Sequence, residues 1–142
     1  MKLAPSSVDI SVKMSQPDRV VLIVDDEPGI REVLGRSLSL AGYQPREAAS
    51  PIEACRIFGQ EHVDAVILDL RMPGLSGFNF LEWLRTESID IGQTVPVLVL
   101  TGFGLTDKEK DTLRRYHAEV FHKPQGMAEI VDRLALVVQL QQ

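Results

Sequence analysis

Five short runs of mostly apolar residues alternate with segments in which apolar residues recur every three or four positions. The runs are Val20–Val24, Tyr43–Ala48, Ala65–Leu68, Val95–Leu100 and Glu119–His122. The runs predict strands, and the periodic segments between them predict amphipathic helices. Because strands that alternate with helices form a parallel sheet covered on both faces, the sequence predicts an α/β fold with five strands and five helices.

Polar residues within two of the runs indicate which strands lie at the edges of this sheet. Pro45, Arg46 and Glu47 lie in the second run, and Glu119 and His122 lie in the fifth. Because such residues belong at sheet edges, the second and fifth strands are expected at the two edges, which matches the strand order 2-1-3-4-5. This is the order of the flavodoxin-like doubly wound fold, in which ligands bind beyond the carboxyl ends of the strands.

The length of the chain indicates its number of domains, and its charge bears on whether it contacts nucleic acid. Its 142 residues fit one domain, which we place at residues 18–142, after a flexible tail or linker remnant at residues 1–17. A net charge of -5, with no output domain after Leu140, predicts no direct contact with nucleic acid. No segment resembles a signal peptide or a membrane span, so we expect a cytoplasmic protein. Cys55 and Trp83 are predicted to pack in the interior.

Residues that suit one chemistry follow four of the predicted strands. Asp25 and Asp26 follow the first strand, Asp69 the third, Thr101 the fourth and Lys123 the fifth. Each residue alone has an ordinary interpretation as a helix cap, a turn residue or a surface group. Because the carboxyl ends of parallel strands meet at one edge, however, we expect all five side chains to converge there.

The converging side chains would form a phosphoryl-transfer site. Clustered carboxylates repel one another, so their pKa values rise or a cation binds among them. Oxygen ligands without histidine or cysteine favour Mg2+. A carboxylate can then attack phosphorus, because the metal offsets the repulsion between the anions, while a lysine and a hydroxyl contact the phosphoryl oxygens.

Four motifs around these residues resemble the receiver domains of two-component response regulators. The motifs are Val-Asp25-Asp26-Glu-Pro, Leu68-Asp69-Leu-Arg-Met-Pro-Gly-Leu-Ser-Gly77, Leu100-Thr101-Gly102 and Lys123-Pro124. The resemblance covers about Arg19 to Leu140. It implies a phosphorelay module, and not an enzyme beyond its own phosphorylation and dephosphorylation. The expected partners are a histidine kinase or phosphotransfer protein and an unidentified downstream protein or domain.

The resemblance also implies a metal site and a phosphoacceptor. Asp69 would be the phosphoacceptor. Asp25, Asp26 and Asp69, with the backbone carbonyl of Arg71, would bind Mg2+.

Roles in switching follow from the same resemblance. Thr101 would be the switch hydroxyl, and Lys123 would contact the phosphate and precede a cis peptide bond. The family often has an aromatic residue three positions before the lysine. Here that position is Val120, and Phe121 is predicted to lie on the other face of the strand.

Other functions that involve phosphate make different demands on the sequence. A haloacid-dehalogenase-like phosphatase carries a second aspartate two residues after the nucleophile, where this chain has Arg71. A flavin carrier needs a phosphate loop rich in Ser, Thr or Gly after the first strand, where this chain is acidic. A binding module that works without phosphorylation remains an alternative.

Arg71 and Phe103 are also predicted to flank the phosphoryl group and slow its hydrolysis.

Overall fold

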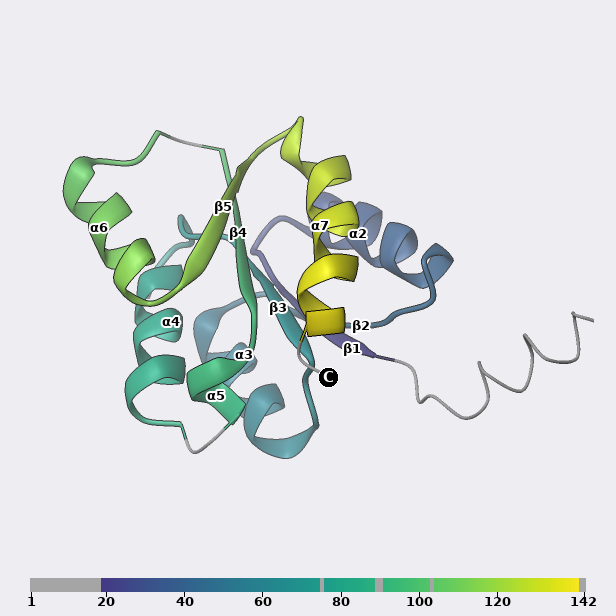
Figure 1. The fold of residues 1–142 in the computed structure, drawn as a ribbon, viewed down its shortest axis with the longest axis horizontal. Coiled ribbons are helices and arrows are strands. Elements are labelled where there is room, and N and C mark those ends of the chain that lie inside the picture. The colour runs from purple at the N-terminus through teal and green to yellow at the C-terminus, as the bar shows by residue number, and fades with distance from the viewer. Residues whose placement is uncertain (1–18, 75, 89–90, 103, 141–142) are drawn as a thin grey trace, which may run out of the picture.

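The computed structural model describes residues 19–74, 76–88, 91–102 and 104–140. Five strands in this part of the chain form one sheet with the order β2-β1-β3-β4-β5, and all neighbours are parallel (Figure 1). The strands are β1 (Val20–Val24), β2 (Gln44–Ala48), β3 (Ala65–Leu68), β4 (Val97–Thr101) and β5 (Ala118–His122). The predicted fold and strand order are therefore confirmed.

The five predicted helices are present, together with one short additional helix. They are α2 (Pro28–Leu40), α3 (Pro51–Gln60), α4 (Gly77–Thr86), α6 (Asp107–Arg115) and α7 (Gly126–Leu140). The additional helix, α5 (Ile91–Thr94), lies where the sequence indicates only a loop. Four residues make barely one turn, which is too short for a helical period to be recognised. The predicted tail at residues 1–17 lies outside the described residues.

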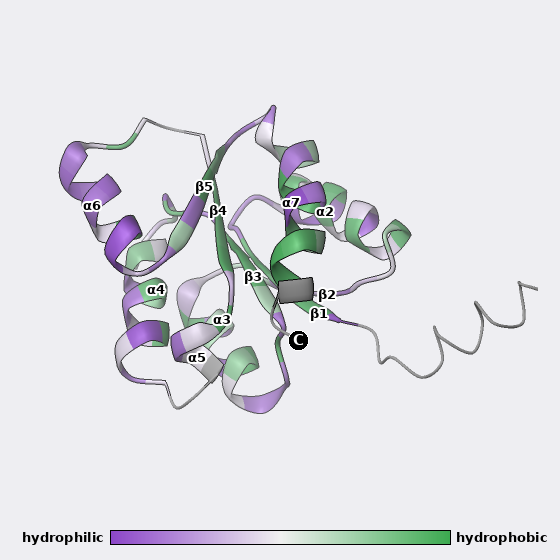
Figure 2. Cartoon of the chain, viewed as in Figure 1, coloured by the Kyte–Doolittle hydropathy of each residue, from purple (hydrophilic) through white to green (hydrophobic). Residues whose placement is uncertain are grey.

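The helices cover the two faces of the sheet as two separate layers (Figure 1). Helices α2 and α7 pack on one face, where Leu34, Leu38 and Ile130 join a buried cluster with Ile23 and Ile67 of the strands. Helices α3, α4 and α6 pack on the other face. Figure 2 shows the central strands as hydrophobic and α6 as mostly hydrophilic. Because both faces of the sheet are buried, the ends of the strands are where polar side chains can be placed.

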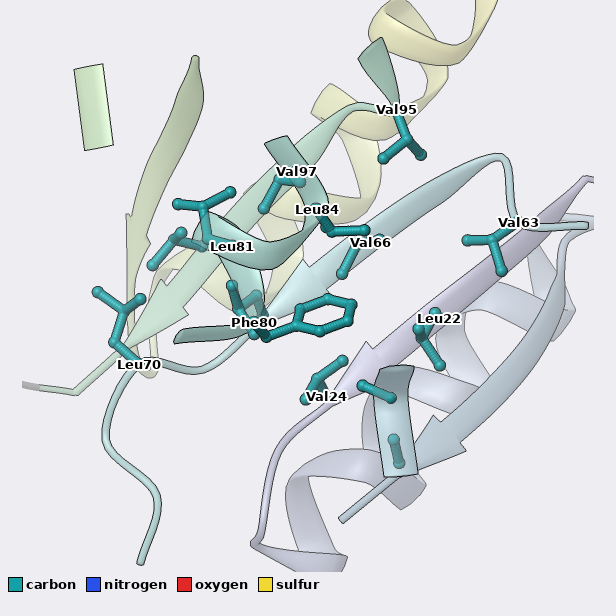
Figure 3. Close-up of a cluster of buried hydrophobic side chains, with 14 of the residues drawn as sticks. Leu22, Val24, Val63, Val66, Leu70, Phe80, Leu81, Leu84, Val95 and Val97 are labelled. Carbon is teal, nitrogen blue, oxygen red and sulfur yellow. The ribbon is translucent and has the colours of Figure 1, made fainter. Parts of the chain in front are cut away.

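Helix α4 supplies the largest side chain of the cluster on the α3–α4 face. Figure 3 shows the Phe80 ring among the side chains of Leu22, Val24 and Val66. Trp83 stacks on Phe80 with ring centroids 6.0 Å apart, which confirms its predicted packing role. Cys55 packs against the same cluster but is half-buried, so the prediction of an interior position is only partly correct.

Helix α4 begins against the backbone of Asp69, and only glycine fits at that contact. The Gly77 amide donates a hydrogen bond to the Leu70 carbonyl at 3.1 Å. A Cβ atom at Gly77 would overlap the Asp69 carbonyl oxygen and lie 2.9 Å from the Leu70 Cα. The start of α4 therefore fixes the backbone that carries the predicted phosphoacceptor.

Gly77→Ala should destabilise the protein by about 2 kcal/mol or more, because backbone atoms cannot move aside as side chains do. Gly59→Ala is the matched control, since a Cβ atom at this helical position meets nothing within 4 Å. The control should be neutral or stabilising by up to about 1 kcal/mol. Urea unfolding monitored by circular dichroism measures both. Equal effects of the two substitutions would contradict the close approach at Gly77.

Candidate functional site

The ladder of hydrogen bonds between the strands places two of the predicted acidic residues side by side. Val24 of β1 pairs with Leu68 of β3, and the Asp69 amide continues the ladder by donating to the Val24 carbonyl at 2.8 Å. The Asp25 amide donates to the Ala48 carbonyl of β2 at 3.1 Å. Both carboxylates are held at the buried edge of the sheet, where Asp25 is 2 % exposed and Asp69 is 4 % exposed.

The three predicted carboxylates form a cluster. Carboxylate oxygens of Asp25, Asp26 and Asp69 all lie within 4.8 Å of one another. Burial raises the pKa of Asp69 to about 6, and the charge of Asp25 adds to this shift while Lys123 opposes it. Burial also raises the pKa of Asp25. A cluster of oxygen donors alone, with an incomplete cage, matches the ligand preference of Mg2+, so these residues fit the expected ion.

Lys123 reaches this cluster from the end of β5. Its Nζ lies 2.8 Å from Glu27 Oε1, 3.0 Å from Asp25 Oδ2 and 3.9 Å from Asp69 Oδ1. Burial by itself would lower the pKa of Lys123, but the bonds to Glu27 and Asp25 outweigh it and raise this pKa. The lysine therefore stays charged and offsets part of the negative charge. The predicted cis bond between Lys123 and Pro124 is present.

Thr101 is the last residue of β4 and is fully buried. Its Oγ1 has no hydrogen-bond partner within the described part of the chain. Its carbonyl accepts from the Lys123 amide at 2.9 Å, so the hydroxyl and the lysine are held side by side at the ends of adjacent strands. Because a buried hydroxyl without a partner costs about 1–3 kcal/mol, Thr101 is a site where a ligand oxygen would be stabilising.

Two acidic residues near the site were not predicted from the sequence to belong to it. Glu27 pairs with Lys123, which lies 96 positions away, and its amide donates to Asp25 Oδ1 at 2.9 Å. Its position in the acidic run was the one available signal. Glu109 of α6 pairs with Arg71 through two hydrogen bonds of 2.8 and 3.0 Å. No sequence pattern links residues 38 positions apart in this way.

The sequence also made predictions for Val120, Phe121, Arg71 and Phe103, and the structure tests only the first two. Val120 packs with the α3–α4 cluster and Phe121 with the α2–α7 cluster, which confirms that they lie on opposite faces. The Arg71 guanidinium binds Glu109 in this structure, and the predicted shielding of a phosphoryl group by Arg71 stays a prediction. Phe103, the other predicted shield, lies outside the described residues.

Comparisons with known proteins agree with this geometry. The response regulator receiver domain family matches residues 21–135. The chain is 32% identical over 112 residues to sporulation initiation phosphotransferase F of Bacillus subtilis, covering 79% of this chain and 87% of that protein. It is 35% identical over 118 residues to the probable transcriptional regulator ycf27 of Porphyridium aerugineum, covering 83% of this chain but 47% of that protein. The chain thus spans about half the length of this curated relative.

A solved structure shows the same fold. The response regulator protein TrrA of Thermotoga maritima, in complex with Mg2+-BeF, matches with a TM-score of 0.69 and 30% identity over 82% of this chain and 96% of that chain. The family match covers more than half of the sequence and includes the acidic cluster at the ends of β1 and β3. This protein therefore belongs to the response regulator receiver domains, which are phosphoacceptor signalling modules of two-component systems.

Proposed function

We propose that Asp69 accepts a phosphoryl group from the phosphohistidine of a histidine kinase or phosphotransfer protein. The observation that carries this proposal is the cluster of three carboxylates within 4.8 Å, two of them almost fully buried. Burying like charges this close is unfavourable, and a cation that bridges them relieves the repulsion. The cluster therefore supports a function in which a cation bound by these carboxylates allows an anionic phosphoryl group to approach Asp69.

In the transfer step, a carboxylate oxygen of Asp69 attacks the phosphorus atom. The bond between phosphorus and the imidazole nitrogen of the donor breaks, and that nitrogen keeps the electron pair and takes up a proton. Lys123 would then contact the phosphoryl oxygens, and the Thr101 hydroxyl would donate to one of them. Lys123 now lies nearer to Glu27 and Asp25 than to Asp69, so we expect its ammonium to move toward the acceptor.

The metal site in this proposal consists of Asp25, Asp26, Asp69 and the backbone carbonyl of Arg71. Mg2+, when bound, offsets the repulsion between the acceptor carboxylate and the incoming phosphoryl group. The residues of the chain orient the acceptor: the amide of Asp69 is bonded to β1, and Gly77 packs on its carbonyl.

The other functions considered from the sequence fit this arrangement less well. Arg71 replaces the second aspartate of a haloacid-dehalogenase-like phosphatase, and an arginine that is bound to Glu109 cannot serve as a general acid. A binding module that works without phosphorylation would not need buried, clustered carboxylates. The labelling experiment below distinguishes this alternative.

We further propose that residues 18–142 act as the receiver in the cytoplasm and residues 1–17 as a tail or linker. The receiver would transmit its signal by contacting a downstream protein or domain, and not by direct contact with nucleic acid. Helix α6 offers an exposed surface for such contact, because only Leu113 among the residues of this helix is buried. No helix among the described residues is long and apolar enough to cross a membrane.

Acetyl phosphate with Mg2+ should add one phosphoryl group to the wild-type protein, as measured by intact mass. Asp69→Ala should abolish the addition, because the nucleophile is gone, and chelation of Mg2+ should also suppress it. Asp132→Asn on α7 is the matched control and should label like wild type, since this aspartate is exposed and lies outside the cluster. Labelling of Asp69→Ala at the wild-type level would contradict the proposal.

Asp69→Asn should stabilise the metal-free protein at neutral pH. The folded-state pKa of Asp69 is raised to about 6. The stability that Asp69 contributes is therefore complete below its unfolded pKa of about 3.9 and is lost as the pH rises through 6. The amide should gain about 1–3 kcal/mol near pH 7.5 and almost nothing near pH 4. Denaturant unfolding at the two pH values measures the difference.

Mg2+ supplies the matching test of the same cluster. It should raise the melting temperature of wild type near pH 7.5, and it should raise that of Asp69→Asn less, because one charged ligand is missing. A gain from Asp69→Asn that did not change with pH would show that ionisation of the buried Asp69 carboxyl is not its cause.

A further inference from the structure

The Arg71 side chain leaves the acceptor loop and binds a different helix. Its two terminal nitrogens donate to the two carboxylate oxygens of Glu109, at 2.8 and 3.0 Å, in a bidentate ion pair. Nη2 also lies 3.5 Å from the Gly104 carbonyl. The pair joins the loop after β3, which carries Asp69, to the first turn of α6. Both side chains are partly exposed, at 36% and 24%.

Glu109 also helps to cap the helix on which it lies. Its Oε1 accepts from the Thr106 amide at 3.0 Å, and the Thr106 hydroxyl accepts from the Glu109 amide at 3.1 Å. Oε1 therefore serves both the capping box and Arg71. Among the nine residues of α6, only Leu113 is buried, so tertiary packing holds this first turn weakly. A change at Glu109 should therefore loosen the start of α6.

A phosphoryl group on Asp69 would compete with Glu109 for Arg71. Arg71 is two residues from Asp69, so its side chain leaves the same loop that carries the acceptor. Phosphorylation would add charge and acceptor oxygens at Asp69, and a guanidinium binds such oxygens in the bidentate geometry that it now uses for Glu109. The existing pair is weakened by solvent, so it can be exchanged.

We propose that the ion pair between Arg71 and Glu109 acts as a latch, which couples the phosphorylation of Asp69 to the stability of the first turn of α6. In the unphosphorylated protein, Glu109 is a positioning residue that holds Arg71 away from the acceptor. When Asp69 carries a phosphoryl group, Arg71 binds the phosphoryl oxygens, Glu109 is released, and the first turn of α6 loosens. This inference rests on the proposed role of Asp69. It supplies a path to α6 that does not depend on an aromatic residue at Val120.

Amide hydrogen exchange measured by NMR, with and without Mg2+ and beryllofluoride as the phosphoryl analogue, tests the latch. The reporters are the amides of Thr106, Glu109 and Lys110, each of which donates a hydrogen bond in this turn. In wild type, beryllofluoride should speed their exchange about 2- to 5-fold, the size expected for loss of a partly exposed ion pair. Amides of β3 and β4 report whether beryllofluoride has bound.

Two variants remove the latch from either side. Glu109→Gln keeps an oxygen for the Thr106 amide but loses the charge, and Arg71→Gln loses the guanidinium. In both, exchange at the three amides should already be fast without beryllofluoride and should not increase when it binds. Glu109 lies outside the metal cluster, so its variant decides the question if Arg71→Gln fails to bind beryllofluoride.

Asp111→Asn is the matched control on the same helix. It breaks an exposed ion pair with Arg114, 2.6 Å long, that does not involve the acceptor loop. The response to beryllofluoride should therefore persist in this variant. An unchanged exchange rate in wild type, or a full response in Glu109→Gln, would overturn the latch.

Phosphoryl labelling of the wild-type sample separates the latch from the proposed function. If acetyl phosphate labels Asp69 while the amides of α6 do not respond, the latch is wrong and the phosphoacceptor assignment stands. If neither labelling nor beryllofluoride binding occurs, the proposed function fails, and the latch fails with it.

Discussion

Asp25 and Asp69 lie side by side at the buried ends of neighbouring strands, and the repulsion between them is the constraint on which the rest of the site depends. Each is at most 4 % exposed, so water screens their charges poorly. Lys123 offsets part of the repulsion by lying between Glu27 and Asp25. Burial first, and the charge of Asp25 second, raise the pKa of Asp69, and Lys123 opposes this shift without cancelling it. The pocket is therefore arranged to gain stability when a further cation enters it.

The hydrophobic layers hold these charges in place. Leu22 and Val24 of β1, and Val66 and Leu68 of β3, pack under α4, so the strands cannot slip without exposing the core. Since side chains alternate along a strand, a shift by one residue would move every apolar side chain to the wrong face. The chain therefore carries its acceptor on a rigid support, whereas its Arg71 side chain reaches a helix that packs weakly. A buried support for the acceptor, together with a partly exposed ion pair at Arg71, suits a signalling module.

Much of this arrangement could be predicted from the sequence, because it depends on the order of strands and helices along the chain. The apolar runs determine the strands, and the residues directly after them, such as Asp69, Thr101 and Lys123, necessarily meet at one edge of the sheet. The polar residues of β2 and β5 indicate the two edge strands, and the order of the inner strands is that of the known doubly wound fold. These inferences use local composition and one topological rule, so they needed no knowledge of side-chain conformation.

The pairs that involve flexible side chains were not predictable in the same way. Glu27 with Lys123, and Arg71 with Glu109, join residues that are 96 and 38 positions apart. Which partner a long side chain chooses depends on small energy differences among several rotamers. The short helix α5 was missed for another reason, since one turn shows no period. The sequence therefore predicted the positions of the site residues better than their contacts.

A crystal structure of the protein with Mg2+ and beryllofluoride would test the central claim most directly. The account predicts that beryllofluoride is bonded to the Asp69 carboxylate, with Mg2+ held by the three clustered aspartates. Lys123 should then have moved from Glu27 toward the fluorides, and the Thr101 hydroxyl should donate to one of them. Beryllofluoride bound at another residue, or a cluster that binds no Mg2+ at saturating concentration, would contradict the account.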